Sequence, residues 1–355
     1  MNGRSGAPDR VLIVRLGAIG DVANALVVAN ALRDAHPGCF IGWAVHPLSA
    51  PLVEGHPSID RVHVWPRGTG VAGFRALRRE IVAEDYDVAI DLQRLQKSSL
   101  VARLSGAPRV LGFDRARAKE LSWIWTRERI VPGPRREHMV RQYMRFPRLL
   151  DLPDAPPRRS LPSPEAASAF ADDFAAKHGA PLLLNLGASR PDKLWPPSSF
   201  RELAADLLAS PLAGLDGPLV LTGGPQDRAA ADEVARDLEV HDLVGRTSLP
   251  ELWALCARSR AMVSADTGPM HLCAAVGTPT VALFGPGDPA RTGPFGEGHV
   301  VLVAGRPLAM EDGSVSLGEP HAPAATAETT PRAVRSALER LLRAGHGAGA
   351  PKPVT

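Results

Sequence analysis

The sequence predicts an α/β protein of two domains, each built around a parallel sheet, and three observations support this prediction. Residues 10–16 (RVLIVRL) form a continuous apolar run typical of a buried parallel strand, and a glycine turn and a helix-spaced apolar pattern follow it. The same order begins again at Leu182, where LLLNLGA resembles LIVRLGA of residues 12–18. A third unit of strand, glycine turn and helix spans 260–275. This alternation is typical of doubly wound sheets.

Length and composition also favour two domains. The chain has 355 residues, which exceeds what one core usually supports, and 45% apolar with 22% charged residues is ordinary for a globular enzyme. Residues 151–164 contain five prolines and no clear period, which indicates an interdomain linker. We expect an N-terminal domain over 10–160 and a C-terminal domain over 165–343. The ends, 1–9 and 344–355, are predicted to be disordered.

The remaining elements follow from apolar periodicity. In the first half, we expect strands at 41–45, 62–65 and 88–92 and a helix at 74–83. In the second half, we expect strands at 219–222 and 280–284 and helices through Phe200 to Leu208, over 249–257 and over 331–343, with Thr330 as the N-cap of the last. Residues 304–329 show no clear period.

Several classes of protein are disfavoured by the composition. No stretch approaches the roughly 20 apolar residues of a membrane span, and the polar first ten residues do not resemble a signal peptide. Cys39, Cys256 and Cys273 are few and unclustered, which argues against a disulfide framework and a cysteine metal site. We therefore expect a cytoplasmic protein without a metal or a cofactor.

Residues 264–271 (SADTGPMH) form a turn suited to an anion. Asp266 or Thr267 can serve as N-cap, Gly268 lets a ligand approach the backbone, and Pro269 suits the first helical turn, where a missing N–H costs nothing. The free amides and the positive end of the helix dipole then face one point. The turn is predicted to bind a phosphate.

Four segments together carry a family resemblance. They are GAIGDV at 17–22, DLQRLQKS at 91–98, GASRPDKLWP at 187–196, and DTGPMH at 266–271 with GTPTVALFGP at 277–286. In this order and spacing, from about Arg10 to about Pro294, the chain resembles glycosyltransferase family 9, the heptosyltransferases of lipopolysaccharide core assembly. The resemblance implies GT-B architecture: two Rossmann-like domains face each other across a cleft, with the acceptor bound mainly by the first and the nucleotide sugar by the second.

Sugar transfer needs a base for the incoming hydroxyl and charge stabilisation on the leaving diphosphate. The resemblance implies that Asp21, in the first glycine turn, is the base, and that Lys193 lies in the loop that meets the phosphates. No Asp-x-Asp cluster of the metal-dependent transferases occurs in these loops. We therefore expect an inverting, metal-independent glycosyltransferase, with ADP-heptose as the donor that the family implies.

The candidate donor site includes further residues from the same loops. They are Ser189, Gly223, Asp227, Asp266, Thr267, Gly268, Pro269, Met270 and His271. Asp227, which follows the strand at 219–222, is a candidate for a ribose hydroxyl. Structural roles remain open for several of these side chains: Asp266 as a cap, His271 as a neutral core histidine, Asp227 as a solvated carboxylate, Lys193 as a surface lysine on Trp195, and Asp21 as a first-turn carboxylate.

Charge distribution bears on the acceptor. Residues 114–148 contain ten Lys or Arg and four Asp or Glu, a net charge of +6, so the rest of the +3 chain carries −3. Together with Trp123 and Trp125, this segment suits an anionic glycolipid at the inner face of the cytoplasmic membrane, although a solvated basic face would look similar. No nucleic-acid-binding motif is present, so nucleic acid is not an expected partner. The candidate acceptor residues are Gly20, Asn24, Lys97, Arg117 and Lys119, in a chain expected to be monomeric.

Departures from the family pattern leave the acceptor open. Asn24 stands where many members have histidine, Gln93-Arg94 replaces Gln-Gly, and 304–329 lacks the cysteines often found there. Rival functions are a hydrolase or epimerase of the same fold, which needs no acceptor, and a non-catalytic nucleotide-sugar binding protein, which would not need Asp21. A dinucleotide oxidoreductase is disfavoured because residues 17–20 lack the full G-x-G-x-x-G spacing.

Overall fold

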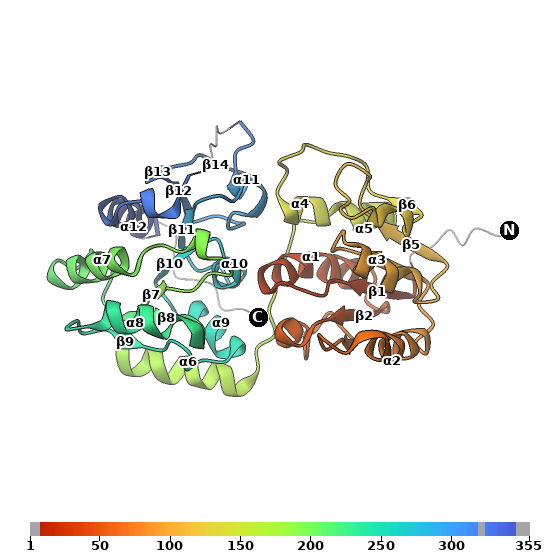
Figure 1. Cartoon of the computed structure of the whole chain (residues 1–355), viewed down its shortest axis with the longest axis horizontal. Helices are drawn as coiled ribbons and strands as arrows, with labels where there is room; N and C mark the ends of the chain where they lie inside the picture. Colours follow the sequence, from red (N-terminus) through yellow and green to blue (C-terminus); the bar gives the residue numbers. More distant parts are fainter. Residues whose placement is uncertain (1–7, 319–323, 346–355) are drawn as a thin grey trace. The chain divides into compact units, whose positions relative to one another are not determined.

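The computed structural model describes residues 8–318 and 324–345. The chain divides into two compact units, Met1–Pro162 (unit 1) and Ser163–Thr355 (unit 2), and each unit is a sheet with helices packed on it (Figure 1). The boundary between the units lies inside the proline-rich stretch 151–164. Residues 152–164 form neither helix nor strand.

Unit 1 is built on a six-stranded, fully parallel sheet in the order β3-β2-β1-β4-β5-β6. Its strands are β1 Arg10–Val14, β2 Phe40–Val45, β3 Arg61–Val64, β4 Val88–Asp91, β5 Arg109–Gly112 and β6 Glu128–Arg129. Its helices are α1 Ile19–Ala35, α2 Gly70–Val82, α3 Gln96–Arg103, α4 Met139–Tyr143 and α5 Arg145–Leu149, with 3-10 turns η1 Pro47–Leu52 and η2 Ser122–Ile124.

Unit 2 has a seven-stranded sheet in the order β13-β12-β11-β10-β7-β8-β9, parallel except for the edge strand β13. Its strands are β7 Leu182–Asn185, β8 Leu219–Thr222, β9 His241–Asp242, β10 Ala261–Ala265, β11 Thr280–Phe284, β12 His299–Val303 and β13 Arg306–Pro307, and β14 Met310–Glu311 pairs separately with β15 Ser314–Val315. Its helices are α6 Glu165–His178, α7 Pro197–Ala209, α8 Arg228–Ala235, α9 Leu249–Ala257, α10 Gly268–Ala275, α11 Pro289–Thr292 and α12 Pro331–Gly345, with turns η3 Pro191–Lys193, η4 Pro225–Asp227 and η5 Thr326–Glu328.

Both sheets share one topological feature. In unit 1 the chain moves from β1 outward to β3 and then returns to the other side of β1 with β4. In unit 2 it moves from β7 outward to β9 and returns beside β7 with β10. Each sheet therefore has a point where strand order reverses. Ligands of doubly wound sheets bind outside the carboxyl ends of the strands at such a point.

Burial explains why the first helix is apolar on nearly every side. In α1, all residues from Val22 to Leu32 are buried, because the helix packs on η1, α4 and α5 as well as on its own sheet. The core of unit 2 is larger and gathers side chains of its sheet, α7 and α12 around Trp195, whose Nε1 donates to Thr329 O at 2.7 Å.

The structure confirms the expected strands and helices, with small shifts at their ends. The expected helix at 74–83 begins earlier, at Gly70, and Thr330 does cap the last helix, since its Oγ1 accepts from Ala333 N at 3.3 Å. The segment without a clear period contains β13, β14, β15 and η5. The expected elements lack α4, α5 and η2, which are too short to show a period, and also lack the longer helices α3, α6 and α8 and the strands β5, β6, β9 and β12.

The predicted disordered ends need correction where the structure describes them. In the segment 1–9, Pro8 is buried and Asp9 O accepts from Phe40 N at 2.7 Å, so these two residues extend the start of β1. In the segment 344–355, helix α12 continues through Gly345. Residues 1–7 and 346–355 lie outside the described part of the chain.

Polar contacts hold the end of the linker on unit 1. His56 Nε2 lies 3.1 Å from Ser160 O, while Ser58 N donates to His56 Nδ1 at 3.0 Å. Asn30, on α1, donates from Nδ2 to Arg158 O at 2.8 Å. Burial lowers the pKa of His56 to about 4, despite its hydrogen bond to Ser160 O. The neutral imidazole is therefore the form that holds this contact.

This geometry predicts a pH-dependent stability of unit 1. Because the folded-state pKa of His56 lies below its unfolded value of about 6.5, the unfolded state binds more protons between these values, and stability is lost as the pH falls through them. Urea unfolding followed at about pH 7 and about pH 5 should show a loss of roughly 2 kcal/mol from His56. His56→Gln should reduce the pH dependence. An identical pH dependence for wild type and His56→Gln would contradict the prediction.

Candidate active site

The strongest candidate site in unit 2 is an ion pair where the strand order reverses. Lys193, at the end of η3 after β7, places Nζ 2.5 Å from Oδ2 of Asp266, which directly follows β10. The Lys193 side chain is 18% exposed and that of Asp266 is 9% exposed. The pair is thus largely removed from water and lies immediately before helix α10. The structure brings together two residues that are 73 positions apart in the sequence.

Buried hydrogen bonds tie together the strands beneath this pair. Asn185, the last residue of β7, donates from Nδ2 to Gly187 O at 2.9 Å and to Ser264 Oγ of β10 at 3.1 Å. Thr222, the last residue of β8, donates to Asn185 Oδ1 at 3.5 Å. All three side chains are buried, so the network fixes the carboxyl ends of three neighbouring strands. The loops that follow start from a rigid base.

The turn before α10 differs in detail from the expectation. Thr267 occupies the N-cap position with an extended backbone, but its side chain makes no capping hydrogen bond, and Asp266 is directed to Lys193 instead of the helix. Pro269 lies in the first turn, as predicted. A Cβ added to Gly287, after β11, would lie 2.8 Å from Asp266 Oδ2, so this carboxylate requires a glycine beside it.

The last two residues of the motif face inward. Met270 has no exposed surface and packs with Phe284 and Val301 in a core cluster, so its side chain supports the turn from below and has no surface to offer a ligand. His271 is buried as well, at 7% exposure. Thr267 and Gly268 are partly exposed at the start of the helix. The exposed surface of the turn is therefore formed by Thr267, Gly268 and Pro269, with the Lys193–Asp266 pair beside them.

Asp227 lies at the neighbouring strand end but is engaged locally. Its Oδ2 accepts from Gly224 N at 2.8 Å and from Gln226 Nε2 at 3.1 Å. A Cβ at Gly187 would lie 2.4 Å from Asp227 Oδ2, and one at Gly223 would lie 2.9 Å from it, so the carboxylate packs over two glycines. Ser189 is exposed in the loop between Gly187 and η3. The Asp227 carboxylate therefore stabilises the turn after β8 at this edge of the sheet.

Unit 1 has a corresponding ion pair where its strand order reverses. Asp21, in the first turn of α1, forms an ion pair with Nη2 of Arg15, the residue that follows β1. Arg15 is buried at 5% side-chain exposure, and its Nη1 donates to Leu92 O beyond β4 at 3.2 Å. Asp21 is 42% exposed. A buried arginine therefore holds a carboxylate that remains open to solvent.

The loop after β4 carries a cation over an aromatic ring. Lys97 places Nζ 3.9 Å from the centroid of the Trp65 ring, and Trp65 is itself buried. Partial burial, and then the positive charge of Arg67, lower the pKa of Lys97. Asp91, at the end of β4, accepts from Gln93 N at 2.9 Å and from Ser99 Oγ, and burial raises its pKa. Asp91 thus holds the loop that presents Lys97.

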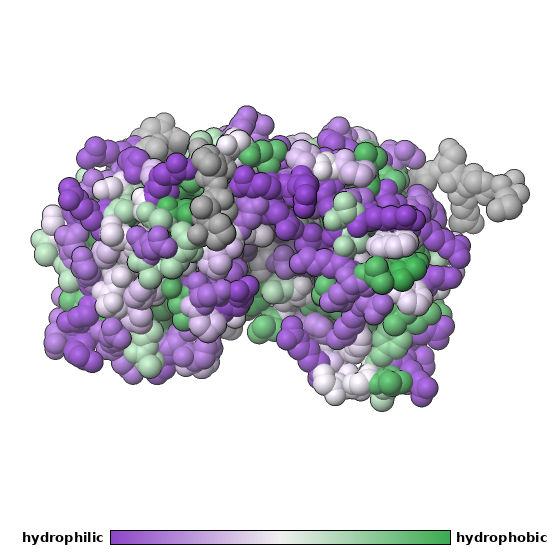
Figure 2. Space-filling view, turned by 45° about the horizontal axis from the view of Figure 1, so that its top comes forward, coloured by the Kyte–Doolittle hydropathy of each residue, from purple (hydrophilic) through white to green (hydrophobic). Residues whose placement is uncertain are grey.

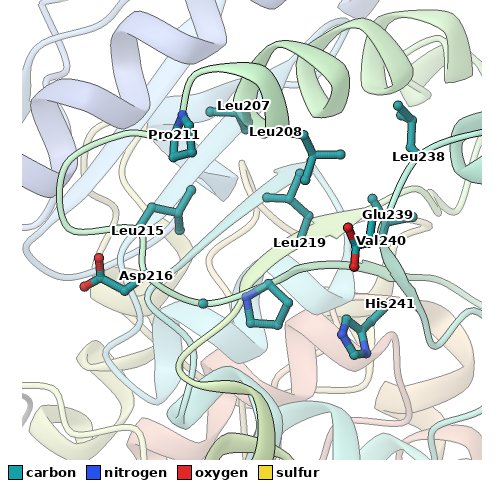
Figure 3. Close-up of a pocket in the computed structure, with 12 residues that line it drawn as sticks. Leu207, Leu208, Pro211, Leu215, Asp216, Leu219, Leu238, Glu239, Val240 and His241 are labelled. Atoms are coloured by element: carbon teal, nitrogen blue, oxygen red, sulfur yellow. The ribbon is translucent and has the colours of Figure 1, made fainter.

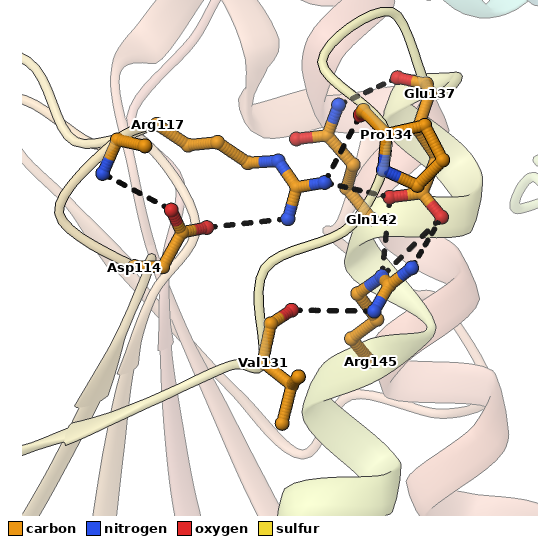
Figure 4. A network of polar contacts seen from close by, with 8 residues as sticks. Asp114, Arg117, Val131, Pro134, Glu137, Gln142 and Arg145 are labelled. Atoms are coloured by element: carbon orange, nitrogen blue, oxygen red, sulfur yellow. Dashed lines mark hydrogen bonds and ion pairs between the residues drawn. The ribbon is translucent and has the colours of Figure 1, made fainter.

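The other two cationic acceptor candidates, Arg117 and Lys119, differ in how far their charges are exposed to solvent. Arg117 is buried and bonds Asp114 Oδ2 at 3.2 Å and Glu137 Oε2 at 3.1 Å, and Glu137 also binds Arg145 at 2.7 Å (Figure 4). Its charge is therefore compensated inside unit 1. Lys119 is exposed.

The two acceptor candidates on α1 are buried. Gly20 has little exposed surface, and Asn24 is 2% exposed, with its Oδ1 accepting from Arg159 at 3.2 Å. Both residues therefore support the start of α1 beside Asp21, and neither presents polar atoms at the surface of the helix.

A pocket of about 460 Å³ lies elsewhere in unit 2. It is lined by Leu207, Leu215, Leu219, Leu238 and His241 among others, at the amino ends of β8 and β9 (Figure 3). It is thus at the opposite edge of the sheet from Lys193 and Asp266. In the described residues, no group of three or more His, Cys, Asp or Glu side chains is arranged to hold a metal ion. Over the same residues, no helix is long and apolar enough to cross a membrane.

Each unit has the 3-2-1-4-5-6 order of a Rossmann-like domain, with an ion pair of a basic residue and a carboxylate at its reversal point. These features define a two-domain α/β protein of the class that binds nucleotides at strand ends. In solved structures, the chain is similar to a glycosyl transferase family 9 protein from Veillonella parvula, with a TM-score of 0.80, 24% identity and coverage of 95% of this chain and 98% of that one. The GT-B fold class is confirmed.

The family follows from the sequence comparisons. The model of glycosyltransferase family 9 (heptosyltransferase) matches residues 74–316. The chain is 31% identical to lipopolysaccharide heptosyltransferase 1 of Pseudomonas aeruginosa, over 84% of this chain and 85% of the relative. It is also similar to the E. coli heptosyltransferase WaaC solved with ADP-2-deoxy-2-fluoro heptose, at 25% identity, TM-score 0.73, and 93% and 99% coverage. The chain belongs to glycosyltransferase family 9, and it is a glycosyltransferase.

Several residues of these sites were not predicted. Arg15 lies within an apolar run of the sequence, Arg67 follows β3 without a motif, and Gly287 directly follows the GTPTVALFGP segment. An arginine inside RVLIVRL was a usable signal, because a charge in a buried strand requires a partner. Gly287 carried no such signal, since its role depends on the position of Asp266.

The Lys193–Asp266 pair should contribute measurably to the stability of unit 2. In Lys193→Met, the Asp266 carboxylate loses its ion-pair partner, and the free energy of unfolding should fall by about 1–3 kcal/mol. The exposed pair of Arg190 and Asp192 in the same loop is the matched control, and Arg190→Met should cost less than about 0.5 kcal/mol. The double variant Lys193→Met/Asp266→Asn should recover part of the loss in denaturant unfolding. Equal costs for the two single variants would refute this ranking.

Proposed function

We propose that this glycosyltransferase moves heptose from ADP-heptose to an anionic glycolipid, the inner core of lipopolysaccharide, with inversion at the anomeric carbon and without a metal ion. The observation that carries the proposal is the Lys193–Asp266 pair at the start of α10, at the reversal point of the unit 2 sheet. The relatives, a lipopolysaccharide heptosyltransferase 1 and a heptosyltransferase solved with ADP-2-deoxy-2-fluoro heptose, support the donor and the acceptor. We further propose that the enzyme is a monomer and acts at the cytoplasmic face of the membrane.

Unit 2 offers two kinds of positive charge to a diphosphate. An ammonium group has three N–H donors. The ion pair with Asp266 does not use all three donors of Lys193, so the ammonium can also donate to a phosphate oxygen. The exposed backbone around Thr267 and Gly268 adds the positive end of the α10 dipole. Asp266 then holds the lysine beside the helix start. Together these groups stabilise the leaving diphosphate without a divalent cation.

Unit 1 offers the base. In the proposed step, the acceptor hydroxyl oxygen bonds to the anomeric carbon as the bond from that carbon to the β-phosphate oxygen breaks. The hydroxyl proton passes to the Asp21 carboxylate, and ADP leaves with the electron pair. Arg15 orients Asp21 from below while leaving the carboxylate partly exposed. Attack opposite the leaving group inverts the anomeric centre.

The acceptor is proposed to bind beside the same reversal point. Burial, and then the nearby charge of Arg67, lower the pKa of Lys97, and two neighbouring cations are stabilised by an anion. The buried Trp65 ring lies beneath the Lys97 ammonium and holds it at the surface of the unit. Lys119 is a further exposed cation of unit 1. A phosphorylated or carboxylated sugar fits this combination better than a neutral one.

The alternatives make different use of these residues. A non-catalytic nucleotide-sugar binding protein would have no need for a buried arginine that holds a solvent-exposed carboxylate in unit 1. A hydrolase or epimerase would release or rearrange the sugar without an acceptor. Family membership and the Arg15–Asp21 pair both favour transfer.

Calorimetric titration in EDTA with ADP, UDP, GDP and NAD tests the donor site. ADP should bind selectively, and Lys193→Ala should weaken ADP binding at least tenfold, a loss of about 1.4 kcal/mol, because a cation at the phosphates is removed. Arg190→Ala, in the same loop, should change it less than twofold, or about 0.4 kcal/mol. Preference for UDP or GDP would overturn the donor, loss of ADP binding in EDTA would overturn metal independence, and NAD binding alone would overturn the function.

Replacement of the base tests the reaction. Asp21→Asn keeps the shape of the side chain but cannot accept the proton, so kcat for transfer should fall by about 10²–10⁴-fold while ADP affinity stays within a few-fold. Asp34→Asn is the matched control, since Asp34 is another ion-paired carboxylate of α1. ADP release is measured with and without heptose-free lipopolysaccharide. Undiminished transfer by Asp21→Asn would refute the base, and equal ADP release without acceptor would favour the hydrolase.

A further inference from the structure

One loop of unit 1 exposes apolar side chains to an unusual extent. Leu121, Ile124 and Val131 are 61%, 56% and 72% exposed. In the described parts of the chain, large apolar side chains that are more than half exposed occur only in unit 1, where Leu48 and Val71 are the other two. Three of these five side chains thus lie within eleven residues of one loop. We call the exposed residues of 115–135 the loop surface.

The local backbone explains how two of these side chains are placed. Residues 122–124 form the 3-10 turn η2, and Ile124 N donates to Leu121 O at 3.0 Å. Leu121 precedes the turn and Ile124 ends it, so the two exposed side chains lie at its two ends. Ser122 between them is buried and anchors the turn.

The exposed charge of the loop surface is strongly positive. Three carboxylates of this region are paired with arginines: Asp114 and Glu137 with the buried Arg117 (Figure 4), and the partly exposed Glu128 with Arg109 at 2.7 Å. The exposed charged side chains that remain are Arg115, Lys119, Glu120, Arg127 and Arg135. Four cations thus face solvent with a single carboxylate. Along the chain they alternate with Leu121, Ile124 and Val131.

Trp123 lies among the cationic and apolar side chains of this region and contacts two of the arginines. The guanidinium of Arg115 lies 4.3 Å from the centroid of the Trp123 ring, and that of Arg129 lies 5.7 Å from it. Trp123 is half-buried, so part of its ring faces solvent. Tryptophan, arginine and short apolar residues together are characteristic of surfaces that lie in the headgroup layer of a bilayer.

The distribution of charge favours a bilayer over a protein as the partner of the loop surface. The cores of protein interfaces are depleted of charged residues, whereas cations interleave with the apolar residues here. A hydrophilic surface with separate apolar patches is visible in the space-filling view as well (Figure 2). An anionic bilayer accepts both groups at once, with phosphates for the arginines and the acyl boundary for the apolar side chains.

We propose that the loop surface docks unit 1 on an anionic phospholipid bilayer. Leu121, Ile124 and Val131 insert at the headgroup boundary, and Arg115, Arg127 and Arg135 bind lipid phosphates. The proposal rests on the proposed function in one respect, that the acceptor is a membrane glycolipid. It assigns membrane contact to residues other than Lys97, Asp21 and those of the donor turn.

Vesicle co-sedimentation of the full chain tests the proposal, with phosphatidylcholine vesicles alone and mixed with phosphatidylglycerol. The wild type should bind the mixed vesicles, and binding should weaken with added salt. Arg115→Gln/Arg127→Gln/Arg135→Gln should lower affinity by about fivefold per residue. Leu121→Ser/Ile124→Ser/Val131→Ser should lower it at least about tenfold. Leu48→Ser/Val71→Ser, equally exposed residues elsewhere in unit 1, should change it less than twofold, or about 0.4 kcal/mol.

Transfer to a delipidated, soluble acceptor separates this proposal from the proposed function. The apolar triple variant should keep wild-type transfer to that acceptor, which also shows that it folds. Absence of any transfer by the wild type would count against the proposed function and leave vesicle binding as the test of docking. Wild-type affinity of both triple variants for mixed vesicles would overturn the docking surface. So would a wild-type dimer in sedimentation velocity that the apolar triple variant converts to monomer, because the loop surface would then be a protein contact.

Discussion

The reversal of strand order in each sheet is the constraint on which both candidate sites depend. Parallel strands end at a common edge, and the crossovers on either side of the reversal run in opposite directions. The loops after β1 and β4, and those after β7 and β10, are therefore left uncovered by helices. This single topological feature brings Asp21 near the loop of Lys97 and brings Lys193 to Asp266.

Each uncovered edge contains an ion pair in which one partner is more buried than the other. In unit 1 the buried partner is the cation, Arg15, and the exposed partner is the carboxylate, Asp21. In unit 2 the more buried partner is the carboxylate, Asp266, and Lys193 is the more exposed one. Since a buried charge needs its partner, the buried member fixes the exposed one in place. The exposed charge is negative at the proposed base and positive at the proposed diphosphate site.

The basic segment of unit 1 shows why charge counts need a structure. Its net charge of +6 arises from ten cations and four carboxylates. The fold places Asp114 and Glu137 against Arg117 and Arg145, in the interior of the unit. These two carboxylates form ion pairs inside the unit, so few carboxylates oppose the cations at the surface. Arg117, which looked like a ligand for acceptor anions, is one of the residues that neutralise them.

By itself, the sequence determined the strand, glycine turn and helix units that begin at Arg10 and Arg260, most of the other strands, the two-domain division near 151–164 and the family. These follow from periods, glycine and proline positions and short motifs, all of which are local. The tertiary structure decided which strand ends are neighbours, that Asp266 binds Lys193 instead of capping its helix, and that Met270 faces the core. It also decided that Arg15 lies beneath Asp21. Such pairings depend on the strand order and on side-chain burial, and neither is encoded in the spacing of residues along the chain.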